Sequence, residues 1–271
     1  MIFYIFEEKM MFQVDFENFL IGEGHSFRKE GFLYHFDSGM EIHLVPQNFP
    51  VENITPLGEK RIYLYEDRWY HDNEVIKKRV SANLGRFTTI FARNCEVQAV
   101  DNDTVKQFLN RYHSYGYARA KYKYVLKYKG EVVAAALFSA PRLFEREIDG
   151  IQYKLQSYEW VRYASKDDVR VVGGMGKLMN AFIKEHSPQE IMSYSDREWS
   201  NGDVYRRLGF REVEVRPAVE FLVDKGSYER ISVKKIDNDK RYKKFDNSLE
   251  NYYRIKNLGS VKWLKIISLQ K

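Results

Sequence analysis

Short runs of aromatic and β-branched residues, separated by Gly, Pro and Asn, dominate the first 95 residues. The runs Gly31–Phe36, Glu41–Val45 and Arg61–Tyr65 have the length and composition of strands. Between Asn73 and Leu84 the apolar positions fall on one helical face, and a glycine follows, which predicts one helix. We therefore expect a β-rich N-terminal region over residues 1–95.

The hydrophobic periodicity changes near Cys95. In chain order it predicts a helix from about Asp103, a hairpin of strands 121–128 and 131–139, a strand over 153–163, a glycine-rich loop over 165–176, a helix over 177–185, a strand over 191–194 and a helix over 203–208. In the segment 211–223, alternation places five apolar residues on one side: Val213, Val215, Val219, Phe221 and Val223. This mixture of strands and helices predicts the α/β class with a mixed sheet.

Composition narrows the class of protein. Of the 271 residues, 44% are apolar and 15% aromatic, which is enough for a buried core and excludes general disorder. The single cysteine, Cys95, excludes a disulfide scaffold and any Cys-rich metal site, and the histidines lack ligand spacing, so no metal is expected. Acidic residues interrupt the apolar start of the chain, and no apolar run approaches membrane-spanning length. A cytoplasmic protein without a membrane partner is predicted.

Positive charge is concentrated at the C-terminus. Residues 225–271 contain 13 basic and 5 acidic side chains, a net charge of +8, which leaves −2 for residues 1–224 of a chain with +6. Five aromatic residues are interleaved with these charges: Tyr242, Phe245, Tyr252, Tyr253 and Trp263. Two interpretations stay open for this predicted C-terminal extension. It is a solvated surface that aids solubility, or it follows the phosphates of a nucleic acid and stacks on its bases.

Two short segments carry candidate chemistry. The first is a glycine-rich run between a predicted strand and a predicted helix: Arg170, Val171, Val172, Gly173, Gly174, Met175, Gly176 and Lys177. Glycines allow close backbone approach, and the free amides of a helix start face an anion such as a diphosphate. The spacing matches neither a P-loop nor the dinucleotide fingerprint. The second segment, residues 201–210, places Tyr205 on a short helix, where its phenol either protonates a leaving thiolate or is a core aromatic.

Together, these elements resemble the GCN5-related N-acetyltransferase (GNAT) superfamily over roughly residues 95–223. The resemblance implies a GNAT-like acyl-CoA N-acyltransferase fold over 96–224, with acetyl-CoA or another acyl-CoA as cofactor. It also implies that the cofactor diphosphate sits on the amides of residues 171–177, that Asn201 lies near the pantetheine arm, and that Tyr205 is the general acid. The family motif Gln/Arg-x-x-Gly-x-Gly/Ala fits with Gly174 and Gly176, but Val171 then occupies its Gln/Arg position.

A narrower resemblance concerns a GNAT-like module common in phage proteins, where it often follows a nuclease domain. The segments that resemble it are 157–162, 172–178 and 193–200, and residues 65–69 and 90–95 resemble the connecting region. Residues 1–60 contain no matching nuclease active-site run. The phage DNA-modifying Mom-type proteins look like distant relatives of this module, so nucleic acid is a possible substrate or partner.

Acyl transfer to an amine also needs a base and an acceptor site. The resemblance makes Glu159 the base, acting directly or through water, although an ion pair with Arg162 or with a lysine is the alternative. Asp196 binds the substrate amine or orients Tyr205, or else it pairs with Arg197 or caps the next helix. His113 lines the acceptor site, or it is an ordinary surface histidine. These alternatives stay open at the level of the sequence.

The sequence therefore predicts an enzyme, an N-acyltransferase that moves an acetyl or related group from acyl-CoA to an amine by direct attack. One rival is a phage or mobile-element protein that modifies or binds nucleic acid on the same fold. The other rival is a GNAT-like module without catalytic activity. The acceptor, the acyl group and the oligomeric state are not readable from the sequence.

Overall fold

A computed structural model describes residues 2–47, 49–50, 54, 60–238 and 250–269, with the side chains of residues 2–10, 237 and 238 left aside. The chain divides into two compact units. The first unit comprises residues 1–84, 196–201 and 215–260, and the second unit comprises residues 85–195, 202–214 and 261–271. Each unit is thus assembled from segments far apart in sequence, a division that differs from the three consecutive segments predicted above.

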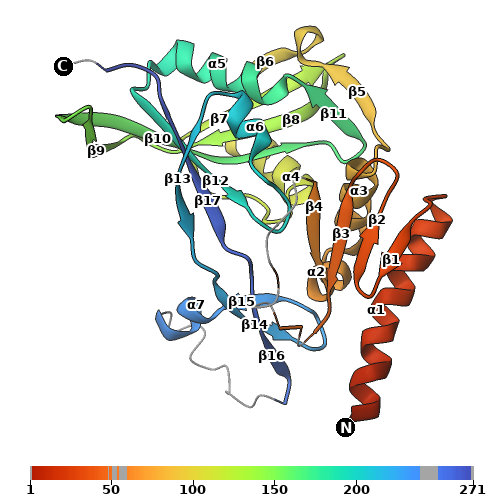
Figure 1. The fold of residues 1–271 in the computed structure, drawn as a ribbon. Helices are drawn as coiled ribbons and strands as arrows, with labels where there is room; N and C mark the ends of the chain where they lie inside the picture. The colour runs from red at the N-terminus through yellow and green to blue at the C-terminus, as the bar shows by residue number, and fades with distance from the viewer. Residues whose placement is uncertain (1, 48, 51–53, 55–59, 239–249, 270–271) are drawn as a thin grey trace. The chain divides into compact units, whose positions relative to one another are not determined.

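The first unit contains a four-stranded sheet in the order β1-β2-β3-β4, with α1 drawn beside it in Figure 1. Its first elements are α1 (Ile2–Gly22), β1 (Arg28–Glu30), β2 (Leu33–His35), β3 (Glu41–Val45), β4 (Arg61–Tyr65), α2 (Glu66–His71) and α3 (Asn73–Asn83). The three predicted strands and the predicted helix are present. The 21-residue helix α1 was not predicted. Its buried side chains Phe12, Phe16 and Leu20 recur at four-residue spacing, which places them on one helical face.

The later residues of the first unit form a second, three-stranded sheet in the order β15-β14-β16. Its elements are β14 (Glu220–Asp224), β15 (Arg230–Ser232), α7 (Val233–Asn238) and β16 (Tyr252–Lys256). Both pairings are antiparallel. The predicted one-sided alternation is wrong over this region. Val213 and Val215 are exposed, whereas Leu222 and Val223, neighbours in sequence, are both buried, because the segment is two strands in different sheets.

Three buried charges connect distant segments of the first unit. The guanidinium of Arg230 donates through Nε and Nη2 to the carboxylate of Asp67, and Nη1 lies 3.2 Å from Oε1 of Glu198. None of the three side chains is more than 4% exposed. Buried carboxylates need compensating charge and hydrogen bonds, and one planar guanidinium supplies both to two of them. This triad therefore holds α2, residues 196–201 and β15 together.

The triad makes the stability of the first unit dependent on pH. Burial raises the pKa of Glu198 above its ordinary value of 4.5; Asp196 and Asp67 raise it further, whereas Arg230 and Arg68 lower it. The folded protein binds this proton more tightly than the unfolded chain does. The free energy of unfolding contributed by Glu198 is therefore fully present below about pH 4.5 and is lost as the pH rises through the raised pKa.

We expect Glu198→Gln to flatten that pH dependence by about 1–3 kcal/mol between mildly acidic and mildly alkaline conditions. Denaturant unfolding of both proteins at several pH values measures the difference. An unchanged slope of stability against pH in the variant would contradict the assignment of this titration to Glu198.

The second unit is built around an eight-stranded sheet that follows the order β13-β17-β12-β10-β8-β7-β6, with β9 paired to β10. Its elements are β5 (Thr88–Phe91), the 3-10 helix η2 (Ala92–Asn94), β6 (Glu96–Ala99), α4 (Asn102–Tyr112), β7 (Tyr122–Tyr128), β8 (Glu131–Phe138), β9 (Arg142–Ile148), β10 (Ile151–Ser165), β11 (Val169–Val172), α5 (Gly174–His186), β12 (Glu190–Asp196), α6 (Asp203–Arg207), β13 (Arg211–Arg216) and β17 (Ser260–Ile266). The sheet is mixed, because β10 runs parallel to β12 and antiparallel to β8. The predicted α/β class is confirmed.

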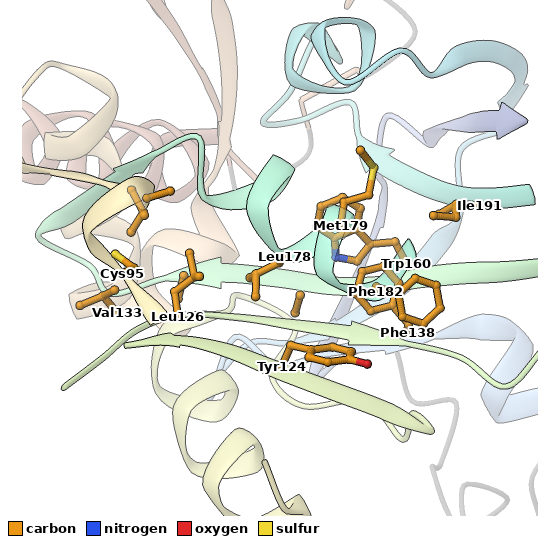
Figure 2. Packing of buried hydrophobic residues seen from close by; sticks show 14 of the residues in the cluster. Cys95, Tyr124, Leu126, Val133, Phe138, Trp160, Leu178, Met179, Phe182 and Ile191 are labelled. Carbon is orange, nitrogen blue, oxygen red and sulfur yellow. The ribbon is translucent and has the colours of Figure 1, made fainter. Parts of the chain in front are cut away.

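Helices cover both faces of this sheet. Helix α5 contributes Leu178, Met179 and Phe182 to the larger core, and Figure 2 shows Phe182 against Phe138, where the two rings stack at 4.0 Å between centroids. Helix α4 contributes Val105, Phe108 and Leu109 to a separate core on the other face. Both helices are amphipathic, which is what a helix on one side of a sheet requires. Among the described residues, no helix combines the length and apolarity needed to cross a membrane.

Two parts of the second unit correct the sequence prediction. Strand β11 forms inside the predicted loop and pairs in parallel with β5, and α5 begins at Gly174 rather than at Lys177. The predicted C-terminal extension ends in β17, which lies inside the sheet between β13 and β12. Trp263 on this strand is fully buried and Tyr253 is 6% exposed, so neither is available to stack on bases. Tyr242 and Phe245 lie outside the described residues.

Candidate functional site

The central feature of the second unit is a pair of parallel strands that stop pairing before either strand ends. Strands β10 and β12 pair from Ser157↔Glu190 to Trp160↔Ser193. Beyond this point β10 continues to Ser165 and β12 to Asp196 without further pairing to each other. The edge of β10 that faces β12 therefore carries backbone groups that need other partners.

A β-bulge marks the same position. The register of β10 against β8 shifts between Trp160 and Arg162, so Val161 is the extra residue. Trp160 and Tyr163 pack toward the core beneath α5, whereas Val161 packs with the core beneath α4. The indole Nε1 of Trp160 donates to the carbonyl of Arg162 at 3.0 Å. Trp160 thus satisfies a backbone acceptor just beyond the last β10–β12 pair.

The predicted glycine loop forms the start of α5. Gly173 is the N-cap residue, with a left-handed φ of 77° and an exposed position, and helical residues follow from Gly174. A methyl group on Gly174 would lie 2.8 Å from the hydroxyl of Tyr163 and 3.0 Å from Cβ of Val171. Gly174 is therefore required for close packing, and Gly173 for the backbone conformation. The first amides of a 13-residue helix have no intrahelical partners and favour an anion.

The side chains around this helix start have separate roles. The guanidinium of Arg170 is exposed and stacks over the ring of Phe87, with 3.9 Å to its centroid. Val171 is buried at the position where the family motif has Gln or Arg. The amine of Lys177 donates to the carbonyls of Ala92 and Cys95, which ties α5 to η2. Any diphosphate at this site is therefore bound through backbone amides rather than through the amine of Lys177.

Tyr205 on α6 is at the centre of a buried hydrogen-bonded group. Its ring stacks on Trp263 at 5.5 Å with an interplanar angle of 7°, and its hydroxyl lies 3.0 Å from Oγ of Ser193. Ser193 donates its one hydroxyl proton to the carbonyl of Trp160 at 3.0 Å, so Tyr205 is the donor to Ser193. Burial raises the pKa of Tyr205, and its hydrogen bond with Ser193 lowers it. The phenol keeps its proton at neutral pH.

Trp263 and Ser195 complete this group. The indole Nε1 of Trp263 donates to Oγ of Ser195 at 2.8 Å. A methyl group on Gly202 would overlap the Trp263 ring, and Gly202 has a φ of 84°, so glycine is needed there for two reasons. Sequence reasoning missed Ser193, Ser195 and Trp263. Two serines at alternate positions of a mostly buried strand, β12, are the signal that could have identified the first two.

Glu159 lies on β10, and His113 follows α4. The backbone of Glu159 bonds to Ser139, and among the described residues no ion pair is formed by its carboxylate. Arg162 donates instead to the carbonyls of Gly116 and Val161 at 3.4 and 2.8 Å. Burial lowers the pKa of Arg162, and Glu159 raises it, which places the two charges close enough to interact. The alternative of a direct Glu159–Arg162 ion pair is therefore not observed.

His113 ends α4, and its Nδ1 accepts the amide hydrogen of Tyr115 at 3.0 Å. The same turn presents the Gly116 carbonyl to Arg162. The structure thus brings His113, Arg162 and Glu159 into one region of the second unit.

Asp196 and Asn201 belong to the first unit. Oδ1 of Asp196 accepts the amide hydrogen of Glu198 at 2.8 Å, and its carbonyl accepts that of Ser200 at 2.9 Å. This is the side chain-to-backbone pattern of a turn.

Comparison with known proteins gives similarity at the level of structure. No protein-family model matches the chain, and no curated protein does. Among solved structures it is similar to a GNAT family acetyltransferase from Elizabethkingia anophelis with acetyl-CoA bound, at 13% identity over 64% of this chain and 99% of that chain, with a TM-score of 0.35. It is also similar to the ribosomal-protein-S18-alanine N-acetyltransferase from Escherichia coli, at 11% identity over 65% and 96%, with a TM-score of 0.40. A Bacillus subtilis acetyltransferase in complex with CoA has 14% identity over 64% and 99%, with a TM-score of 0.33. At these values the similarity assigns neither family membership nor an activity.

Proposed function

We propose that the protein is an N-acyltransferase that transfers an acetyl or related acyl group from acyl-CoA to an amine. The observation that carries this proposal is the divergence of β10 and β12 beside the glycine-led start of α5. An extended ligand arm has unpaired strand edges to follow there, and an anionic group has free helix amides. Acyl-CoA supplies both, together with an acyl group activated as a thioester.

In the proposed reaction the acceptor amine attacks the acyl carbon and displaces the sulfur. The carboxylate of Glu159 takes the proton that the amine loses, directly or through water, because no ion pair competes for it within the described part of the chain. The hydroxyl of Tyr205 donates a proton to the leaving sulfur, and Ser193 orients that hydroxyl. Asn201, Asp196 and His113 are assigned by resemblance to cofactor and acceptor contacts, and a cytoplasmic location stays a prediction.

Titration calorimetry with acetyl-CoA and with free CoA tests the cofactor. We expect saturable binding of both by the unmodified protein. Gly173→Asp should weaken it at least about tenfold, because it adds a negative charge beside the diphosphate site. Gly173→Asn is the matched control, since it has nearly the same shape without the charge, and Asn and Asp both tolerate left-handed backbone. Equal affinity of the two variants would show that no anion binds at this helix start.

Tyr205→Phe tests the acid. Removal of the hydroxyl should lower kcat by about 10²–10³-fold and leave the affinity for acetyl-CoA nearly unchanged, because the stacking on Trp263 is kept. A thiol-release assay with an amine acceptor measures the rate. Unchanged turnover would remove Tyr205 from the mechanism and leave it as a core residue.

The narrower phage-type resemblance and a nucleic-acid substrate stay predictions from the sequence. The salt dependence of binding distinguishes a nucleic-acid substrate from a small amine, because the affinity for a polynucleotide falls steeply as the ionic strength rises.

A further inference from the structure

The first unit contains a cavity of about 160 Å³ that the proposed function does not use. Its lining comes from the end of β3 and the residues after it, from the junction of β4 with α2, and from β14 and β16. Val45, Phe49, Tyr65 and Ile255 supply apolar surface on several sides. The volume and this lining suit a small ligand with an aromatic or aliphatic body.

The polar part of the lining is acidic. Glu66 and Asp67 are 6% and 2% exposed. Oε2 of Glu66 accepts the amide hydrogen of Gln47 at 2.6 Å, which fixes the carboxylate at the cavity wall. Asp67 shares the guanidinium of Arg230 with Glu198, so one buried arginine serves two buried carboxylates.

The cationic side chains that line the cavity are at its exposed rim. Arg254 pairs with Glu220 at 3.1 Å, and both side chains are more than one-third exposed. Lys256 is also exposed, so its charge is screened by solvent. The buried wall of the cavity therefore favours a positively charged occupant.

Tyr253 adds an independent observation. It lines the cavity, it is 6% exposed, and its buried hydroxyl has no hydrogen-bond partner among the described residues. Burial raises its pKa, and Asp67 and Glu66 raise it further, so the hydroxyl is neutral and lies near both carboxylates without bonding to them. Buried polar atoms are almost always paired, so a hydroxyl of this kind indicates a missing partner.

We propose that this cavity binds a small organic cation, a primary ammonium carried on an aromatic or aliphatic body, with Glu66 and Tyr253 as its polar contacts. Two sequence segments meet in the wall and the adjoining triad: residues 65–69 and 196–199. Apart from Asp196, neither segment contributes to the acyl-transfer site proposed above. The site is argued from the first unit alone and does not depend on the acyltransferase proposal.

The test uses benzylammonium as the probe and benzyl alcohol as its uncharged analogue of nearly equal shape. Binding to the full-length protein is measured by calorimetry or by ligand-observed NMR at neutral pH. We expect benzylammonium to saturate one site and to bind at least about tenfold more tightly than benzyl alcohol. Equal affinities would indicate an apolar cavity without charge selectivity. No saturation up to about 10 mM would overturn the proposal and leave a cavity that holds water only.

Two variants identify the contacts. Glu66→Gln keeps an acceptor for the Gln47 amide and removes the charge, and Tyr253→Phe removes only the hydroxyl. Each should weaken benzylammonium at least about fivefold and leave benzyl alcohol nearly unchanged. Glu74→Gln, at an exposed position of α3, is the matched control and should change neither ligand.

Denaturant unfolding shows whether weaker binding by these variants results from misfolding. Because no described residue bonds to the Tyr253 hydroxyl, Tyr253→Phe should unfold at the same denaturant concentration as the unmodified protein or at a higher one. Full benzylammonium affinity in both site variants would assign the cation to another place on the protein.

Discussion

Arg230→Met is expected to lower the free energy of unfolding by about 3–5 kcal/mol, because it leaves two buried carboxylates without their guanidinium. Asp67 and Glu198 are at most 2% exposed and have Arg230 as a shared donor. Methionine fills much of the volume of the arginine stem, so the decrease in the free energy of unfolding results from lost charge compensation rather than from a new cavity. Denaturant unfolding followed by tryptophan fluorescence measures the change in midpoint.

The control for this variant is Arg254→Met in the same unit. Its ion pair with Glu220 is solvent-exposed, and such a pair contributes about 0–1 kcal/mol. Equal losses in the two variants would mean that burial of the triad has no energetic consequence. Partial recovery of Arg230→Met at acidic pH, where the carboxyl groups are protonated, is a further expectation of the same argument.

The second large effect concerns Trp263. Trp263→Ala should cost about 3–5 kcal/mol, since it removes a fully buried indole, the stacking on Tyr205 and the hydrogen bond to Ser195. It should also loosen Tyr205, so near-UV circular dichroism and thermal unfolding should both change. Loss of order at Tyr205 predicts weaker catalysis even at temperatures where the variant remains folded.

Phe91→Ala is the matched control, because Phe91 is an aromatic residue of the same unit that is 45% exposed. This substitution should lower the free energy of unfolding by less than about 1 kcal/mol. Trp263→Phe keeps an aromatic ring but removes the indole N–H that donates to Ser195. We therefore expect an intermediate decrease in the free energy of unfolding. If Trp263→Ala were as mild as Phe91→Ala, β17 would not be part of the stable core of the second unit.

The parts of the fold that sequence reasoning recovered are those governed by local pattern. The hairpin of β7 and β8 turns at Lys129 and Gly130, both with positive φ, and its apolar alternation is visible in the sequence. Helix α4 begins at Asn102 and is capped by Asp101, whose side chain accepts the amide hydrogen of Thr104, and this is a capping signal that can be read directly. Interactions between residues that are close in sequence determine such elements.

The parts that were missed depend on contacts between distant segments. Trp263 was considered as a base-stacking residue because its neighbours are basic, yet its position in the sheet is set by β12 and β13, which lie far away in sequence. Tyr205 and the glycine loop were identified from their spacing, whereas Ser193 acquires its role only when β12 pairs with β10. Periodicity describes a face of an element and does not say what covers that face.

The assembly of each unit from distant segments has a consequence for how the chain matures. The chain passes from one unit to the other five times, and the last passage comes at the start of β17. During synthesis from the N-terminus, the place between β12 and β13 therefore stays empty until residues 260–266 have been made. Tyr205 and Gly202 lack their Trp263 neighbour until then. A nascent chain that has not reached β17 has every predicted site residue and still lacks the ring on which Tyr205 stacks.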